Sequence, residues 1–140
     1  MQYLDTNVVV AYYLPEALNA AVQRLFSGPE RIAISSLSEV EFHSAIARRV
    51  RTKDLAQDDA LEVLSRFKAH VDEALYRMIP VEQHDYALAR EWLATLHTPL
   101  RTLDAIHLAV ASSNRLVVVT ADRVLAESAR HFGIKHRLIL

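Results

Sequence analysis

The sequence contains no cysteine and very little glycine or proline. Without cysteine, the 140 residues provide neither a disulfide framework nor a thiolate nucleophile. The two glycines and four prolines suit a helix-rich chain, and they argue against disorder and against a Gly-rich phosphate loop. No apolar run approaches the roughly 18 residues of a membrane span, and no basic segment followed by an apolar one marks a signal peptide. We therefore expect a cytoplasmic protein that does not contact a membrane.

Apolar residues and arginine are plentiful instead. Hydrophobic residues make up 51% of the chain. A chain of this length buries about two-thirds of its unfolded surface, so we expect a single domain over residues 1–140. The net charge of −1 excludes a protein that binds nucleic acid by a broad cationic surface alone. Arginine nevertheless supplies 13 of the 16 cations, and its planar fork suits phosphates. A nucleic-acid partner fits this balance if metal ions supply positive charge locally.

Short apolar strands alternate with helical patterns along the chain. The expected strands cover residues 2–5, 31–34, 77–81, 116–119 and, at one edge, 134–139. The expected helices cover residues 8–13, 17–26, 37–51, 56–75, 85–96, 102–113 and 122–132. This alternation predicts an α/β fold of three layers, α/β/α, around a mainly parallel sheet of four to five short strands. Helical spacing places Leu61, Leu75, Tyr86 and Leu96 on buried faces.

Four acidic residues lie near junctions between a strand and a helix at the same edge of this sheet. Asp5 ends the first strand, and the others are Glu41, Asp104 and Asp122. In open α/β sheets, ligands bind at the carboxyl edge of the strands. Taken singly, such acids are more often helix caps or acids that complement the helix dipole. Four carboxylates crowded together would raise one another's pKa, and a divalent cation would neutralise them.

Carboxylates grouped in this way indicate metal-assisted hydrolysis. Mg²⁺ and Mn²⁺ prefer oxygen ligands from carboxylates, phosphates and water. Such a site suits hydrolysis of phosphodiester bonds, because the metal activates water and stabilises the leaving oxygen. One assignment stays open on the residues alone: Glu39 and Glu41 lie about 200° apart around one helix, so only one can face the site. The apolar residues spread around that helix do not decide between them.

Four short motifs together make the chain resemble the PIN-domain family, and in particular the VapC-type toxins of type II toxin–antitoxin systems. The motifs are Tyr3–Asn7 (YLDTN), Ser35–Phe42 (SSLSEVEF), Leu100–Ala109 (LRTLDAIHLA) and Val117–Asp122 (VVVTAD). Each is weak alone, but their order and spacing are specific and cover nearly the whole chain. The resemblance implies a metal-dependent endoribonuclease that a cognate VapB-like antitoxin holds inactive.

The resemblance also implies which acids act. The acids of the family correspond to Asp5, Glu41, Asp104 and Asp122, which would be the catalytic residues and the ligands of Mg²⁺ or Mn²⁺. The family pattern selects Glu41 over Glu39 because Glu41 directly precedes Phe42. The fourth acid is the most variable in the family, which makes Asp122 the least secure direct ligand. The family further implies a homodimer, and a helical hairpin over residues 37–75 that offers an apolar groove to an antitoxin helix.

Five neighbouring residues have both a structural and a functional interpretation. Thr6 and Asn7 are helix-capping types whose side chains could also orient water at the metal, and Thr120 could either cap locally or support Asp122. His107 shares a helical face with Asp104, and a buried, hydrogen-bonded histidine is favoured there over a metal ligand. Arg101 is either a solvated surface residue or a contact to substrate phosphate.

Other functions for a strand that ends in aspartate are less compatible with the sequence. A haloacid-dehalogenase-type phosphatase needs a second aspartate two residues later, where this chain has Asn7. A phosphoacceptor receiver domain needs an acidic pair before the acceptor and a lysine after a late strand, and both are missing. The remaining alternative is a PIN-like scaffold that binds RNA or protein without cleaving. Intact acids at all four positions argue against that alternative.

Overall fold

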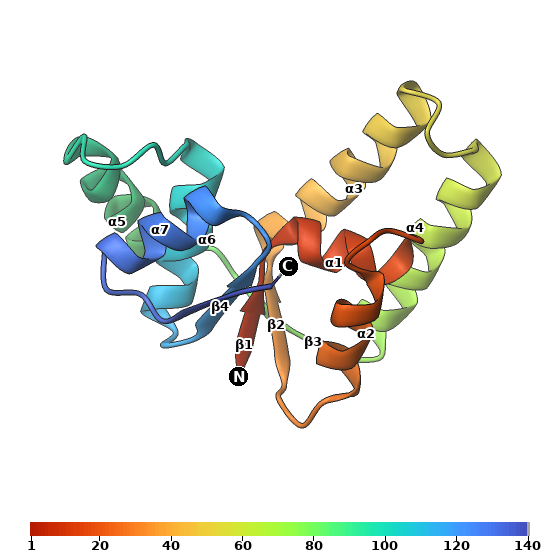
Figure 1. Ribbon diagram of the computed structural model, residues 1–140, viewed down its shortest axis with the longest axis horizontal. Helices are drawn as coiled ribbons and strands as arrows, with labels where there is room; N and C mark the ends of the chain where they lie inside the picture. Colours follow the sequence, from red (N-terminus) through yellow and green to blue (C-terminus); the bar gives the residue numbers. More distant parts are fainter. Residues whose placement is uncertain (140) are drawn as a thin grey trace.

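Five short strands form one parallel sheet in the computed structural model, which describes residues 1–139 (Figure 1). The strands are β1 (Gln2–Leu4), β2 (Ile32–Ser35), β3 (Tyr76–Ile79), β4 (Val117–Thr120) and β5 (His136–Leu138). Their order is β3-β2-β1-β4-β5, and every neighbouring pair is parallel. The predicted α/β class and the expected strand count are confirmed.

Seven helices cover the two faces of the sheet. They are α1 (Thr6–Tyr13), α2 (Asn19–Ser27), α3 (Ser36–Arg51), α4 (Gln57–Asp72), α5 (Gln83–Ala94), α6 (Thr102–Ser113) and α7 (Arg123–His131). Figure 1 shows α1–α4 on one side of the sheet and α5–α7 on the other. Side chains alternate along a strand, so Leu4 joins the core under α1–α4 while Tyr3 joins the core under α5–α7. No helix within residues 1–139 is long and apolar enough to cross a membrane.

The order of the strands places a switch point beside β1. The chain runs outward from β1 to β2 and β3 with its helices on one face, then crosses to β4 on the other side of β1 and continues to β5. Helices therefore leave the carboxyl ends of β1 and β4 toward opposite faces of the sheet. Such switch points are where open α/β sheets bind ligands.

The faces predicted for two helices are partly wrong. Leu61 is 57% exposed, because α4 buries Ala60, Val63 and Phe67 instead. Tyr86 of α5 is also half exposed, and Leu75 lies beyond the end of α4 and is partly exposed. Leu96 is 87% exposed because α5 ends at Ala94, and Leu96 itself has a φ of 59° in the connecting loop.

Candidate active site

Asp5 lies at the switch point, immediately after β1. It occupies the N-cap position of α1, yet its side chain makes no capping hydrogen bond. The hydroxyl of Thr120, at the end of β4, instead donates to Asp5 Oδ2 at 2.9 Å. The Asp5 amide also donates to the carbonyl of Val119 at 3.0 Å. Contacts with β4 therefore hold this carboxylate at the carboxyl ends of β1 and β4, and helix capping does not account for its position.

Glu41, and not Glu39, faces the same edge. Helix α3 begins after Ser35, whose side chain forms a capping box with Ser38. From this start, Glu41 accepts a hydrogen bond from Thr6 Oγ1 at 2.7 Å and another from Nε2 of His107. Glu39 lines a hollow between α3 and α4. The two acids of α3 thus have different surroundings, which periodicity alone could not predict.

A buried hydrogen-bond chain connects Glu41 to the interior of the sheet. The hydroxyl of Tyr3 donates to Ser35 Oγ at 2.8 Å and contacts Nδ1 of His107, whose Nε2 reaches Glu41. Tyr3 and His107 are almost completely buried. Because a carboxylate can only accept, Nε2–H of His107 donates to Glu41, while Nδ1 shares a hydrogen bond with the Tyr3 hydroxyl. Both ring nitrogens of His107 are therefore engaged by protein groups.

Sequence reasoning missed Tyr3 and Ser35 as parts of the site. The signal that could have found them is chemical: a tyrosine in a short, fully buried strand needs a partner for its hydroxyl group. Tyr3 is such a residue, and the partners come from β2 and α6.

The other two acids approach from the opposite face. Asp104 lies in the first turn of α6 and is partly buried. Asp122 is exposed and caps α7, because its Oδ1 accepts from the amides of Val124 at 2.8 Å and Leu125 at 3.3 Å. Its own amide donates to Thr120 at 3.0 Å, so one threonine connects Asp122 to Asp5.

Three other predicted residues lie around this edge with different surroundings. Thr6 is buried as the first residue of α1 and directs its hydroxyl to Glu41 instead of capping the helix. Asn7 is exposed and lines a hollow together with Arg48 and Arg49. Arg101 is exposed at the N-cap position of α6, three residues before Asp104.

Burial and mutual repulsion oppose ionisation of two of the acids. Burial raises the pKa of Asp5, and the nearby His107 and Thr120 offset only part of the increase. The pKa of Asp104 is raised by burial and then by the charges of Asp5 and Asp122. For Glu41, burial also raises the pKa, but the hydrogen bond and charge of His107 outweigh it and leave the pKa below its usual value. The acids are thus close enough to act on one another electrostatically.

The side chains as they stand form no closed metal cage. Within residues 1–139, no group of three His, Cys, Asp or Glu side chains lies close enough together to hold a metal ion. Two of the acids are turned toward protein partners, Glu41 to His107 and Asp122 to the start of α7. The donor set still fits Mg²⁺ or Mn²⁺, because it consists of carboxylate oxygens whose repulsion a cation would relieve. Ligation would require side chains at this edge to rotate.

This repulsion predicts a pH-dependent stability of the metal-free protein. Because the folded-state pKa of Asp104 is raised above the value of 3.8, its contribution is most favourable below that pH. The contribution is lost as the pH rises through the raised pKa. In the presence of chelator, we expect Asp104→Asn to have the same Tm as the wild type near pH 4 and a higher Tm at pH 7. Thermal unfolding at both pH values measures this, and an equal difference at both would contradict it.

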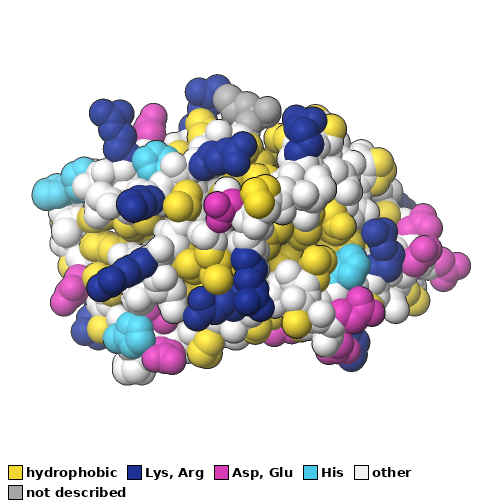
Figure 2. Space-filling model, turned by 90° about the horizontal axis from the view of Figure 1, so that it is seen from below, with side chains coloured by type: hydrophobic (Ala, Val, Ile, Leu, Met, Phe, Trp, Pro, Cys, Tyr) yellow, Lys and Arg dark blue, Asp and Glu magenta, His cyan; other side chains and the backbone are white. Residues whose placement is uncertain are grey.

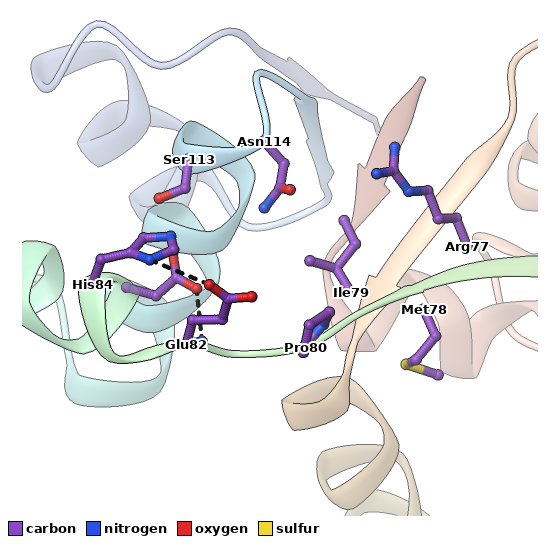
Figure 3. A pocket seen from close by; sticks show the side chains of 9 residues that line it. Arg77, Met78, Ile79, Pro80, Glu82, His84, Ser113 and Asn114 are labelled. Atoms are coloured by element: carbon purple, nitrogen blue, oxygen red, sulfur yellow. Dashed lines mark hydrogen bonds and ion pairs between the residues drawn. The ribbon is translucent and has the colours of Figure 1, made fainter.

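A separate hollow of about 330 Å³ lies beside β3 and the start of α5 (Figure 3). Its polar lining includes Arg77, Glu82, His84 and Asn114, and it contains none of the four acids. The one buried carboxylate here, Asp85, has a local role, because its Oδ2 accepts from the amide of Glu82 at 2.9 Å in the capping box of α5. Its Oδ1 lies 3.3 Å from Nε2 of His84.

Comparison with known proteins identifies the family. The model of the PIN domain matches residues 2–130. The fold is similar to FitAcB from Neisseria gonorrhoeae, with a TM-score of 0.73 and 22% identity over 97% of this chain and 96% of the other. VapC20 from Mycobacterium tuberculosis, a sarcin–ricin loop cleaving toxin, has a TM-score of 0.73 and 17% identity over 91% of this chain and 95% of the other. DNA-bound VapBC from Salmonella typhimurium has a TM-score of 0.68 and 24% identity over 97% of this chain and 96% of the other.

No curated protein matches the sequence significantly. These three structures are below 25% identity and therefore establish the fold alone. The family follows from the domain model, which covers nearly the whole chain. This chain belongs to the PIN domain family.

Proposed function

We propose that the protein is a divalent-metal-dependent endoribonuclease and the toxin of a toxin–antitoxin pair. The proposal is supported by the link from Asp5 through Thr120 to Asp122, and by the pKa of Asp104, which is raised by burial and by the charges of Asp5 and Asp122. Glu41 is the fourth acid of the proposed site. PIN domains usually act as nucleases with divalent metals, and the solved relatives include toxins and toxin–antitoxin complexes. RNA as the substrate places the protein in the cytoplasm.

Each residue has a distinct role in the proposed reaction. Asp5 and Asp104 are the principal ligands of Mg²⁺ or Mn²⁺, and Glu41 and Asp122 complete the negative site. The ion, when bound, makes water a better nucleophile and neutralises charge on the phosphodiester. Thr120 fixes Asp5 through its hydroxyl hydrogen bond. Asn7 and Arg101 are exposed at the same edge, where they can contact the phosphates of the RNA on either side of the cut.

Tyr3 and His107 are positioning residues in this proposal. We expect Tyr3→Phe to weaken Mn²⁺ binding by roughly tenfold, because His107 would lose the partner that fixes its ring against Glu41. Isothermal titration with Mn²⁺ measures the change without any RNA. Tyr13→Phe is the matched control, since Tyr13 also loses a buried hydroxyl hydrogen bond, to Tyr76, away from the acids. Equal Mn²⁺ affinity in the wild type and both variants would contradict a positioning role for Tyr3.

The partners are a VapB-like antitoxin and a second copy of the chain. The antitoxin is supported by relatives whose structures are toxin–antitoxin complexes. A hollow of about 500 Å³ between α3 and α4 includes Leu64, Phe67 and Val71 and would receive an apolar helix. Val40 and Leu61, 67% and 57% exposed on the same two helices, supply apolar surface for a partner. Co-expression with the product of a neighbouring gene and size-exclusion chromatography test both partners.

Cleavage of RNA by purified protein with Mg²⁺, with Mn²⁺ and with chelator tests the function directly. Cleavage with metal and none with chelator is expected, together with growth arrest on expression that an antitoxin relieves. One observation favours a second candidate, a PIN-like scaffold that binds RNA or protein without cleaving: within residues 1–139 the acids form no closed metal cage. RNA binding with no cleavage under any metal condition would support that scaffold.

A further inference from the structure

The amino ends of the strands, opposite the acids, carry cations. Arg31 directly precedes β2, Arg77 lies in β3, Arg115 lies two residues before β4, and Lys135 directly precedes β5. All four are exposed. Figure 2 views the molecule from this side, and Lys and Arg side chains spread over much of the face. Exposed cations are thus a feature of the amino ends of four of the five strands.

These cations surround the first two residues of the chain. The guanidinium of Arg77 contacts Met1 Sδ at 3.5 Å, and the carbonyl of Arg31 accepts from the amide of Gln2 at 2.9 Å. Gln2 also lines a hollow together with two further exposed arginines, Arg24 and Arg137. Another hollow contains both Arg115 and Lys135. We call the set the basic amino-edge surface; it comprises Arg24, Arg31, Arg77, Arg115, Lys135 and Arg137.

The cations of this surface are not paired with acids of the described chain. None of its six cations forms an ion pair with an acid within residues 1–139. Glu30 lines the same hollow as Arg24 but binds the N-terminal ammonium group at 2.9 Å. Glu82 and Asp85 line the hollow that contains Arg77, and neither forms an ion pair with it. A concentration of unpaired positive charge on a protein whose net charge is −1 is a local feature that composition does not explain.

We propose that the basic amino-edge surface binds the phosphodiester backbone of RNA. Five of its six cations are arginine, whose fork matches phosphate oxygens. A docked protein would instead need an apolar centre. Of the seven large hydrophobic residues exposed within residues 1–139, only Leu75 lies at this edge, beside the start of β3. Buried apolar residues such as Leu25 and Leu116 line the hollows between the cations, but the exposed charged groups of this surface are the cations, and their charge complements a polyanion.

The dimensions of the surface suit several phosphates. From β3 to β5 there are four strand intervals, which amounts to about 19 Å. One strand of a duplex presents a phosphate about every 3.4 Å, so this length faces about five of them. The acids lie at the opposite ends of strands of three or four residues, about 10–13 Å away. The bound backbone is thus a part of the RNA distant from the bond being cut. The choice of RNA as the nucleic acid rests on the proposed function.

Salt dependence of RNA binding tests this surface. The double variant Arg31→Gln with Lys135→Gln removes two of its cations, and Lys68→Gln with Arg90→Gln removes the same charges from α4 and α5 as a matched control. Binding of a labelled RNA hairpin is measured in chelator, so that no cleavage occurs, at salt concentrations from about 50 to 200 mM. We expect the slope of log K against log salt to decrease in magnitude by about 2 in the first variant only. Its affinity should fall by roughly tenfold or more.

Each outcome is informative, provided that thermal unfolding shows both variants to be folded. An equal salt slope in the wild type and both double variants would overturn the proposal. An equal loss of RNA affinity in both double variants would overturn it as well. The wild type could also bind polyglutamate as tightly as it binds RNA, and the first variant could lose that binding too. In that case the surface recognises acidic protein and the assignment to RNA fails. Tighter binding of a DNA duplex of the same sequence would reassign the backbone to DNA. Cleavage does not enter this measurement, so failure of the proposed nuclease function and failure of this surface are distinguishable.

Discussion

Replacing Asp5 by asparagine is expected to reduce RNA cleavage by roughly a thousandfold or more and to leave the protein folded. Asp5 lies at the switch point beside β1 and β4, where Thr120 orients its carboxylate. The amide of asparagine keeps the shape and the hydrogen bond from Thr120, but it removes the negative charge that a hard cation requires. Loss of a group that stabilises charge in a transition state typically costs two to three orders of magnitude, and loss of a principal ligand costs at least as much.

The same variant should be more stable than the wild type when metal is absent. Burial raises the pKa of the Asp5 carboxyl, so its ionised form at pH 7 opposes folding. Asparagine carries no charge, and the Tm in chelator should therefore rise. Addition of Mn²⁺ should raise the Tm of the wild type and leave that of the variant nearly unchanged. Higher stability together with lost cleavage would exclude unfolding as the reason for inactivity.

Cleavage gels and thermal unfolding, each with Mn²⁺, Mg²⁺ and chelator, measure both effects. Asp58→Asn is the matched control, because Asp58 is an exposed acid in the first turn of α4 and belongs to no part of the site. Its activity should equal that of the wild type. Equal cleavage by wild type and Asp5→Asn would point to a contaminating nuclease and contradict the proposed function.

Sequence patterns predict the fold better than the geometry of the site. Alternating apolar strands and helical patterns identify the three layers, because parallel strands buried on both faces have few alternatives. They do not predict the switch point between β1 and β4, since strand order depends on which crossovers pack best in three dimensions. The role of Asp5 illustrates the difference. Its sequence position resembles a helix cap, and only the contact with Thr120, 115 residues away, distinguishes it.

Contacts between distant segments also account for what the sequence did not reveal around Glu41. The chain from Ser35 through Tyr3 and His107 joins β2, β1 and α6, and no local pattern encodes it. Local patterns also mispredict burial, as the exposed Leu61 shows. Leu61 has helical spacing to apolar residues of α4, yet Ala60, Val63 and Phe67 face the core instead, so tertiary packing overrides periodicity.

Glu41→Gln and Glu39→Gln should differ sharply, although the two residues are only two positions apart. Glu41→Gln is expected to reduce cleavage by roughly a hundredfold or more, because it removes negative charge from the site and the partner of His107. Glu39→Gln should retain activity within about twofold, since Glu39 faces the hollow between α3 and α4. Initial cleavage rates of the two variants at equal concentration decide between the two faces of α3.

The stability of Glu41→Gln should change in the opposite direction from that of Asp5→Asn. The folded-state pKa of Glu41 is lowered below 4.5 because the hydrogen bond and charge of His107 outweigh burial, so the ionised carboxylate stabilises the fold above that pH. Its replacement leaves buried His107 without an anionic partner and should lower the free energy of unfolding at pH 7 by about 1–3 kcal/mol. This loss should vanish as the pH falls below 4.5. Equal shifts of the same sign in both variants would mean that Glu41 and Asp5 experience the same environment, contrary to the hydrogen bonds that distinguish them.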